Sequence, residues 1–359
     1  MRVENLETGE AAWEPFDQLL IATGAIPFLP DVPGADATGI YGVSTLESGV
    51  RVRRAVDEEK PSKAVIVGGG YIGLEMAEAL LRRGLSVSLV EMLPQVMGTL
   101  DPDMGALVSQ AVRNTGGQLY LEERLEAFEV QDGRLSGVVT DQRTLPADIV
   151  ILGMGVRPNS SLAREAGIPL GVRGAIKTNQ RQQTEGEGIW SAGDCAESFH
   201  LVSRQPFHVA LGTVANKQGR VAGINLGGGY ATFPGVVGTA ASKICDVEVA
   251  RTGLQEVEIE SLGLEYVTAK IESRTRAHYY PNAGKITVKV LAERGSGRLL
   301  GGQIVGIEGA AKRIDVLATA LHAGFTVDRM IDLDLSYAPP YSPVWDPVLI
   351  AIRQIIKKV

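Results

Sequence analysis

The clearest pattern of apolar and polar positions lies between residues 64 and 91. Ala64–Val67 are four consecutive apolar residues, which is typical of a strand buried on both faces of a parallel sheet. Residues 74–83 place apolar side chains with helical periodicity and end at Gly84, so they predict an amphipathic helix. Residues 85–90 form a second apolar run. The order strand, helix, strand predicts a βαβ unit.

A glycine motif joins the first of these strands to the helix. The segment 68–73, GGGYIG, has the spacing GxGxxG, in which glycines permit a tight turn and let the backbone approach a pyrophosphate at the helix N-terminus. Glu91 ends the second strand, at the place where an acid accepts a hydrogen bond from a ribose 2′-OH. A purely structural turn is the alternative for the motif. Because Glu91 would repel a 2′-phosphate, we predict NADH rather than NADPH, unless Arg82 or Arg83 reaches that phosphate.

An internal repeat links two distant segments. FDQLLIATGAIP (16–27) and ADIVILGMGVRP (147–158) match at one offset of 131 residues, with an aspartate, a glycine and a proline in register. Each predicts a buried strand that ends in a turn, so we interpret the repeat as duplicated architecture. Gly68 precedes Asp148, the aspartate of the second copy, by 80 residues. The glycine loop of the first copy would then lie about 63 residues before Met1, and the first copy is expected to be truncated.

The pattern changes after residue 235. Residues 285–306 alternate with period two around a Gly-containing turn at 294–297, which predicts a β-hairpin. Residues 310–322 predict a helix with Ile314, Leu317 and Leu321 on one face. This α+β region contains no phosphate-binding loop. A surface for a partner is its expected use.

Composition and charge narrow the class of protein. The net charge is −7 and no basic run in the chain is longer than the pair Lys357-Lys358, so neither nucleic acid nor an anionic membrane is an expected partner. No segment has about twenty consecutive apolar residues, and we predict a cytoplasmic protein. The two cysteines, Cys195 and Cys245, predict neither a disulfide framework nor a metal site.

Four segments together resemble the flavin-dependent pyridine nucleotide-disulfide oxidoreductases. They are LLIATGAIP, VIVGGGYIGLEMAEAL, GMGVRPN and GIWSAGDCAE, and the resemblance runs from Phe16 to the C-terminus. Within the family's single-cysteine subgroup, RAHYYPNAGK, GAAKRIDVLATAL and SYAPPYSPVWDP look most like coenzyme A-disulfide reductases.

The resemblance implies an α/β architecture of two Rossmann-like dinucleotide-binding domains, with a truncated FAD domain split by the NAD domain, and an α+β C-terminal dimerisation domain. Residues 1–60 would end the first FAD segment, 61–145 form the NAD domain, 146–235 form the second FAD segment and 236–359 mediate homodimerisation.

The resemblance also implies cofactor-binding residues for FAD and NADH. Asp194 would bind the ribityl chain of FAD, Tyr71 would lie between flavin and nicotinamide, and Glu75 would lie near the nicotinamide. The complete set is Thr23, Gly24, Gly193 and Asp194 for FAD, and Gly68, Gly70, Tyr71, Ile72, Gly73, Glu75, Glu91 and Gly155 for NAD.

Tyrosines of the last domain are the implied catalytic residues. Tyr279 or Tyr280, and Tyr337 with Tyr341, occupy family positions from which tyrosines of one subunit enter the coenzyme A-disulfide site of the other. A phenol there can donate a proton or hydrogen bond to a leaving thiolate. Packing in a proline-rich corner is the equally weighted alternative. The pair at 312–313, Lys-Arg, would meet coenzyme A phosphates or lie on a solvated helix face.

The family's redox cysteine belongs to the helix after the first glycine loop, which is outside this chain. Cys195 has no Lys, Arg or His within four residues to activate its thiol, so we predict that it is packed and inert, and Cys245 likewise.

The predicted function is NADH-dependent reduction of FAD, followed by electron transfer to a small-molecule disulfide such as coenzyme A disulfide or a related sulfur acceptor. The alternatives are an NADH oxidase or peroxidase of the same fold, and a non-catalytic dimeric NAD-binding remnant.

Overall fold

The computed structural model describes residues 1–359, which form two compact units. The smaller unit comprises Met1–Ile26 and Val156–Val236, and the larger comprises Pro27–Gly155 and Val237–Val359. No helix in the structure is long and apolar enough to cross a membrane.

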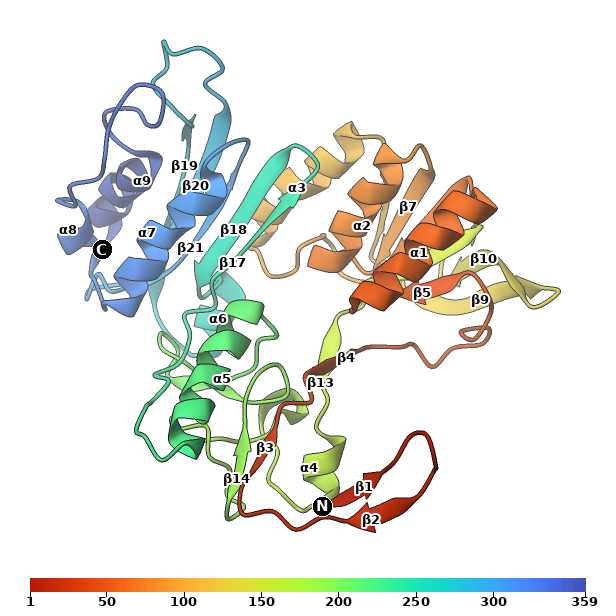
Figure 1. The fold of residues 1–359 in the computed structure, drawn as a ribbon. Helices are drawn as coiled ribbons and strands as arrows, with labels where there is room; N and C mark the ends of the chain where they lie inside the picture. The colour runs from red at the N-terminus through yellow and green to blue at the C-terminus, as the bar shows by residue number, and fades with distance from the viewer. The chain divides into compact units, whose positions relative to one another are not determined.

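The larger unit contains a five-stranded parallel sheet covered on one face by helices (Figure 1). Its strand order is β5 (Ile40–Gly42), β12 (Ile149–Leu152), β6 (Lys63–Val67), β7 (Ser86–Glu91) and β8 (Gln118–Leu121). The helices are α1 (Leu46–Glu59), α2 (Tyr71–Arg82) and α3 (Pro102–Asn114). Leu74 and Met104, both fully buried, pack in the core between these helices and the sheet. The predicted βαβ unit is therefore β6-α2-β7.

A second, antiparallel sheet covers the other face of the parallel sheet. It has the order β11 (Thr144–Pro146), β10 (Arg134–Thr140) and β9 (Leu125–Gln131). Its inner residues Phe128 and Val138 pack with Val65 and Val150 of the parallel sheet. Because one strand alternates its faces, neighbouring residues such as Val65 and Ile66 belong to the two different cores.

Strand pairing assigns two segments differently from the sequence-based boundaries. Residues 27–60, expected in the first FAD segment, contribute α1 and β5 to the larger unit. Residues 149–152, expected in the second FAD segment, form β12 between β5 and β6. The physical reason is hydrogen bonding between strands that are distant in sequence, which no local pattern reports. The domain limits given above remain predictions.

The C-terminal part of the larger unit is an antiparallel sheet backed by helices. The strand order is β17 (Ala240–Ile244), β18 (Val247–Gly253), β21 (Leu299–Gly306), β20 (Lys285–Glu293) and β19 (Tyr266–Arg274). The helices are α6 (Glu256–Ser261), α7 (Ala310–His322), α8 (Val327–Met330), α9 (Pro347–Ile355) and a final 3₁₀ turn (Ile356–Lys358). The predicted β20–β21 hairpin is confirmed, and so is the helix whose buried face contains Ile314, Leu317 and Leu321.

A buried ion cluster attaches the N-terminus of α3 to the C-terminal antiparallel sheet. The Nζ of Lys289, on β20, lies 2.9 Å from Asp101, 2.8 Å from Asp103 and 2.9 Å from Glu256. Lys289 and Asp101 are almost completely inaccessible to solvent. Burial lowers the pKa of Lys289, but hydrogen bonds to its carboxylate partners outweigh it, so the pKa is raised overall.

The smaller unit is built around a short parallel strand pair. β3 (Leu19–Ile21) pairs with β14 (Ile189–Ser191). The other elements are the hairpin β1–β2 (Arg2–Glu4, Ala11–Trp13), the hairpin β15–β16 (Ser198–His200, Gln205–Phe207), α4 (Ser161–Glu165), the 3₁₀ turn Val172–Gly174 and α5 (Gly212–Leu226). Ile21, Ile176 and Cys195 form its core with residues of α4.

The structure supports the interpretation of the sequence repeat. β3 and β12 are both parallel strands at matching repeat positions, and the glycines that follow them, Gly24 and Gly155, both have positive φ (69° and 89°). The Phe28 amide donates to Gly155 (3.0 Å), and the Asn159 amide donates to Gly24 (2.9 Å). These two hydrogen bonds are related by the same 131-residue offset. The last three residues of the two repeats, β4 (Ala25–Pro27) and β13 (Val156–Pro158), pair with each other.

Candidate functional site

The glycine motif forms a turn in which three backbone segments are in direct contact. A Cβ atom at Gly73 would lie 1.9 Å from the Gly68 carbonyl oxygen, and one at Gly153 would lie 2.8 Å from the Gly73 Cα. Gly68 has φ +103°, a conformation that side-chain-bearing residues rarely adopt. The motif therefore needs glycine for packing and for its turn. These reasons are independent of any ligand.

The same turn leaves the start of α2 accessible to an anion. The N-cap, Gly70, provides no side-chain hydrogen bond to the first helical N–H groups. A Cβ atom at Gly70 would meet nothing nearer than 4.0 Å. An uncapped helix N-terminus beside open space is the geometry that binds a phosphate group. The residues therefore fit the pyrophosphate of a dinucleotide.

Glu91 lies at the carboxyl end of β7, directly against this turn. Its Oε2 accepts a hydrogen bond from the Gly69 amide (2.7 Å), and its Oε1 accepts one from the Leu93 amide (2.9 Å). Each carboxylate oxygen retains acceptor capacity for ribose hydroxyls. Arg82 pairs with Glu78, and Arg83 pairs with Asp57. Each of the two arginines that could reach a 2′-phosphate is thus paired with a carboxylate in the structure.

The first turns of α2 position Tyr71 and Glu75. The half-buried Tyr71 accepts a hydrogen bond from Thr99 (3.4 Å), while its neighbour Ile72 is also half-buried. Glu75 accepts a hydrogen bond from Ser242 of β17 (2.5 Å). Glu75 is exposed, so its carboxylate remains accessible beside the glycine turn.

Asp194 carries the strongest indication of a flavin site. Its Oδ1 is buried without a hydrogen-bond partner. An unpaired buried carboxylate oxygen is costly, and such a cost is tolerated where a ligand supplies the missing donor. The hydroxyls of a ribityl chain are donors of this kind. The residues of this unit therefore fit the sugar part of FAD.

Two residues that the motifs did not identify hold the Asp194 loop. The Gly193 amide donates to the side-chain oxygen of Gln218 on α5 (2.9 Å), and Gly193 has φ +86°. The Nε2–H of His208 donates to the Asp194 backbone carbonyl (2.8 Å). Both Gln218 and His208 are buried. In the sequence Gln218 is one glutamine of a helical segment and belongs to no motif. Its role becomes visible only in the structure, where its side chain is buried beside the Asp194 loop.

The remaining predicted FAD residues lie at the end of β3. The Thr23 hydroxyl donates to the Asn159 carbonyl (2.5 Å), and Gly24 accepts from the Asn159 amide. Cys195 has no exposed surface, and its thiol contacts the carbonyls of Ile21 (3.5 Å) and Ala192 (3.4 Å). This burial is consistent with the predicted inert thiol.

Cys245 is also buried. Burial raises the pKa of its thiol. Its backbone amide donates to Glu78 of α2 (2.7 Å). A buried thiol with a raised pKa is a poor nucleophile, which agrees with the interpretation of Cys245 as a core residue.

The structure brings together the two predicted catalytic tyrosines. Tyr279 lies in the loop between β19 and β20, and Tyr337 lies in the loop between α8 and α9. They are 75% and 47% exposed, and the influence of the Tyr279 phenol raises the pKa of Tyr337. Tyr341 is 76% exposed, and the ring of Tyr280 lies 6.0 Å from the guanidinium of Arg276. Tyr279 is thus not a packing residue of the proline-rich corner.

Arg313 differs from its sequence-based interpretation. It was expected to meet phosphates or to lie on a solvated helix face beside Lys312. Its side chain is instead mostly buried and pairs with Asp346 (2.8 Å). It makes further hydrogen bonds to three backbone carbonyls. The guanidinium is therefore a structural centre of the domain, because nearly all its donors are used inside the protein.

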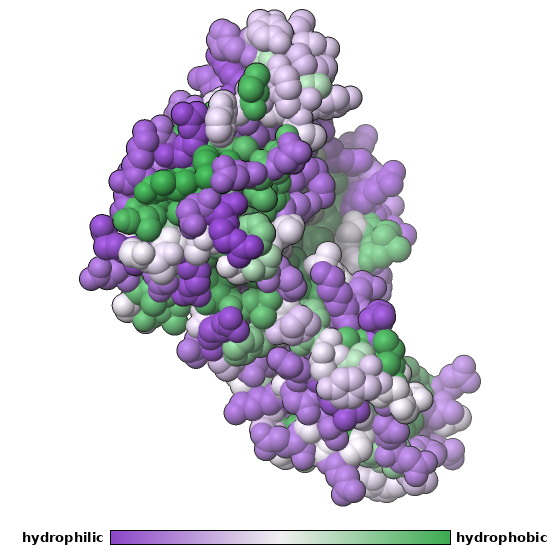
Figure 2. All heavy atoms as spheres, turned by 90° about the vertical axis from the view of Figure 1, so that its left-hand side faces the viewer, coloured by the Kyte–Doolittle hydropathy of each residue, from purple (hydrophilic) through white to green (hydrophobic).

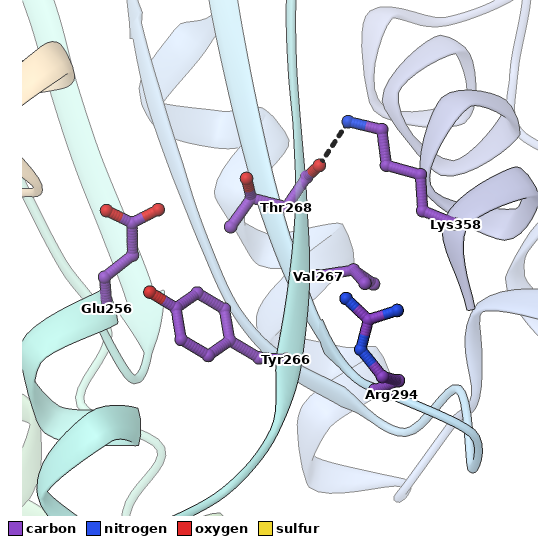
Figure 3. A pocket seen from close by; sticks show the side chains of 6 residues that line it. All are labelled: Glu256, Tyr266, Val267, Thr268, Arg294 and Lys358. Atoms are coloured by element: carbon purple, nitrogen blue, oxygen red, sulfur yellow. Dashed lines mark hydrogen bonds between the residues drawn. The ribbon is translucent and has the colours of Figure 1, made fainter.

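A surface pocket of about 470 Å³ lies elsewhere in the C-terminal sheet (Figure 3). It is lined by Glu256, Tyr266, Val267, Thr268, Arg294 and Lys358. Lys358 donates to the Thr268 carbonyl (2.7 Å). Burial and a hydrogen bond to Glu260 raise the pKa of Tyr266 to about 12. The pocket contains none of the predicted site residues.

Comparison with known families gives two matches. A model described as "Pyridine nucleotide-disulphide oxidoreductase" matches residues 1–219, and the model of the dimerisation domain of that family matches residues 239–347.

Several relatives are similar over nearly the whole chain. The NAD(P)H sulfur oxidoreductase (CoA-dependent) of Pyrococcus furiosus is 38% identical over 97% of this chain and 78% of the relative. An NADH oxidase of Methanocaldococcus jannaschii is 37% identical over 96% of this chain and 76% of the relative. A coenzyme A disulfide reductase of Staphylococcus haemolyticus is 29% identical over 95% and 76%.

Among solved structures, a NAD-dependent persulfide reductase from A. fulgidus superposes with a TM-score of 0.95 at 40% identity. The match covers 99% of this chain and 66% of that chain, so this chain spans just under two thirds of its length.

Proposed function

Since this chain belongs to the pyridine nucleotide-disulphide oxidoreductase family, whose members use FAD and NAD(P)H, we propose that it is an NADH-dependent flavoprotein oxidoreductase of the coenzyme A-disulfide reductase type. The observation that carries the proposal is the turn at 68–73 with Glu91 bound to it. Relatives named for coenzyme A-dependent sulfur reduction support the choice of a disulfide or polysulfide as acceptor.

Each half of the cofactor chemistry has residues in this chain that suit it. The N-terminus of α2 would bind the pyrophosphate of NADH, and Glu91 would accept from the adenosine ribose. Asp194 Oδ1 would accept from the ribityl chain of FAD. FAD held by these residues would supply the redox chemistry that links oxidation of NADH to reduction of a sulfur acceptor.

Tyr279 and Tyr337 suit the protonation of the product. A tyrosine phenol is protonated at neutral pH, and the raised pKa of Tyr337 keeps it so, which leaves its hydroxyl able to donate to a leaving thiolate. The exposure of both phenols makes them available to a substrate or to a second subunit.

A homodimer is part of the proposal. The match to a dimerisation domain supports it. Figure 2 shows hydrophobic atoms exposed among polar ones on the face where α7, α8 and α9 lie. Large exposed apolar side chains occur in and beside the two tyrosine loops, at Tyr279, Ile307, Tyr341, Val344 and Trp345. Such surface is usually covered by a partner. The cytoplasmic location stays a prediction.

The proposal is tested by spectroscopy of the purified 359-residue chain. We expect oxidised-flavin absorbance that bleaches with anaerobic NADH and returns on addition of coenzyme A disulfide, with two thiols formed per NADH. Oxygen consumption without thiol formation would favour the NADH oxidase alternative, which the similarity to the M. jannaschii relative supports. NADH binding by a protein that neither retains nor takes up FAD would favour the non-catalytic alternative and overturn the proposal.

A further inference from the structure

The guanidinium of Arg313 lies between the two loops that carry the predicted catalytic tyrosines. Its Nε pairs with Asp346 Oδ2 (2.8 Å), and its Nη1 donates to the Gly309 carbonyl (3.2 Å). Its Nη2 donates to the carbonyls of Thr275 and Tyr341, both at 2.8 Å. Four of the five guanidinium N–H donors are therefore used, and only 12% of the side chain is exposed.

The acceptors of Nη2 belong to different loops. Thr275 begins the loop 275–284, which carries Tyr279, and Tyr341 lies in the loop 331–346, which also carries Tyr337. A direct backbone hydrogen bond from Ala277 to Pro339 (3.1 Å) runs alongside. Residues 62 positions apart along the chain are thereby held next to each other. One nitrogen atom of Arg313 thus bridges the two loops beside this backbone hydrogen bond.

The partner of Arg313 extends this arrangement into α9. Asp346 caps α9 by accepting from the Val348 amide (2.9 Å), and it also accepts from the Ser342 hydroxyl (3.1 Å). Its side chain is as inaccessible as that of Arg313. The second tyrosine loop is thus attached both to a helix terminus and to α7.

Contact between the two tyrosines is not sufficient to fix their relative positions. Both tyrosines are exposed, and any polar interaction between exposed phenols competes with water. Charge-assisted hydrogen bonds in a poorly solvated place are stronger. We propose that Arg313, through Asp346 and the two loop carbonyls, is a positioning residue that sets the relative placement of Tyr279 and Tyr337. Its catalytic consequence rests on the function proposed above.

Three variants separate this role from general stability. Arg313→Met removes every donor, Arg313→Lys keeps the charge but not the fork geometry, and Arg329→Met is the matched control. Arg329, in the same domain, is exposed, and its guanidinium lies over the Phe325 ring. Each variant is made in the full chain and is first checked for native unfolding behaviour.

The first measurement is the pKa of the Tyr337 phenol. It is obtained by a pH titration monitored by NMR, with tyrosines labelled at the ring carbon that bears the hydroxyl, and the Tyr337 signal is assigned from its absence in Tyr337→Phe. We expect the raised pKa to fall toward the ordinary tyrosine value in Tyr279→Phe and equally in Arg313→Met, with no change in Arg329→Met. This readout does not depend on any enzymatic activity. An unchanged Tyr337 titration in a folded Arg313→Met protein overturns the proposal.

The second measurement is steady-state reduction of coenzyme A disulfide by NADH. We expect kcat to fall about 10- to 100-fold in Arg313→Met, the range expected for misplaced reacting groups, and less in Arg313→Lys. The rate of flavin bleaching by NADH should stay unchanged. If the wild-type protein reduces no disulfide, the proposed function fails, and the Tyr337 titration alone still decides the role of Arg313. If Arg313→Met does not fold, Arg313→Lys is measured in both assays, and wild-type values there overturn the proposal.

Discussion

Replacement of Gly73 by alanine tests whether the glycine turn is determined by backbone packing. The new Cβ would lie 1.9 Å from the Gly68 carbonyl oxygen, whereas real Cβ atoms essentially never approach closer than 3.0 Å, so the two segments must separate by about 1.1 Å. Gly68 cannot move away from the new methyl group because its other side lies against Gly153. A Cβ atom built at Gly68 would be only 2.5 Å from the Gly153 carbonyl oxygen. Overpacking of this kind costs about 1–3 kcal/mol.

Replacement of Gly70 by alanine is the matched control. Its Cβ would meet nothing within 4 Å of the protein except one carbonyl oxygen at 4.0 Å, and its φ of −80° is accessible to alanine. The small loss at the N-cap and the reduced entropy of the unfolded chain nearly cancel, so stability should stay close to that of the wild type. The methyl group projects, however, into the space proposed for the pyrophosphate. We expect NADH binding to weaken on the order of tenfold, which is about 1.4 kcal/mol.

The two variants are compared by thermal unfolding and by NADH titration of protein fluorescence. Gly73→Ala should lower the Tm by roughly 2–12 °C, and Gly70→Ala should leave the Tm nearly unchanged while raising the Kd for NADH. A Gly73→Ala protein as stable as the wild type would refute the packing argument. Wild-type NADH affinity in Gly70→Ala would refute the assignment of the turn as a pyrophosphate site.

Three further variants test the ion cluster and the two cofactor sites. Lys289→Met leaves Asp101 buried without its cation, so the free energy of unfolding should fall by about 3–5 kcal/mol, and by less at acid pH, where the carboxylates are protonated. Because the pKa of Lys289 is raised in the folded state, the stabilisation by Lys289 should be complete below about pH 10 and should be lost as the pH rises through the folded-state pKa. Chemical denaturation of both proteins at several pH values measures this difference. Asp194→Ala should weaken FAD binding by about 10- to 150-fold without lowering the Tm of the flavin-free protein. If the variant and the wild type retain the same amount of flavin after dialysis, Asp194 does not bind FAD. Glu91→Gln removes the repulsion of a 2′-phosphate, so the ratio of NADPH to NADH affinity should rise about tenfold, and an unchanged ratio would show that Glu91 does not select the cofactor.

Local patterns were sufficient for the elements and for the nucleotide turn. The unit β6-α2-β7 and the hairpin β20–β21 follow from hydrophobic periodicity and from glycine spacing, because each signal lies within one continuous stretch of the chain, residues 63–91 and 285–306. The resemblance to the oxidoreductase family, carried by the same motifs, is confirmed by the family matches. The fold class, which the resemblance implied, is confirmed by the same matches.

Only the tertiary structure decided how distant residues act together. Gly153 closes the glycine turn from another strand, Gln218 holds the Asp194 loop from a helix, and Arg313 joins two loops although its neighbour Lys312 suggested a solvated face. The loops that carry Tyr279 and Tyr337 meet because of that packing. A sequence determines which side chains are available and how each short segment folds. The burial that leaves one carboxylate oxygen unpaired, or that consumes the donors of one arginine, depends on contacts between segments that no local period encodes.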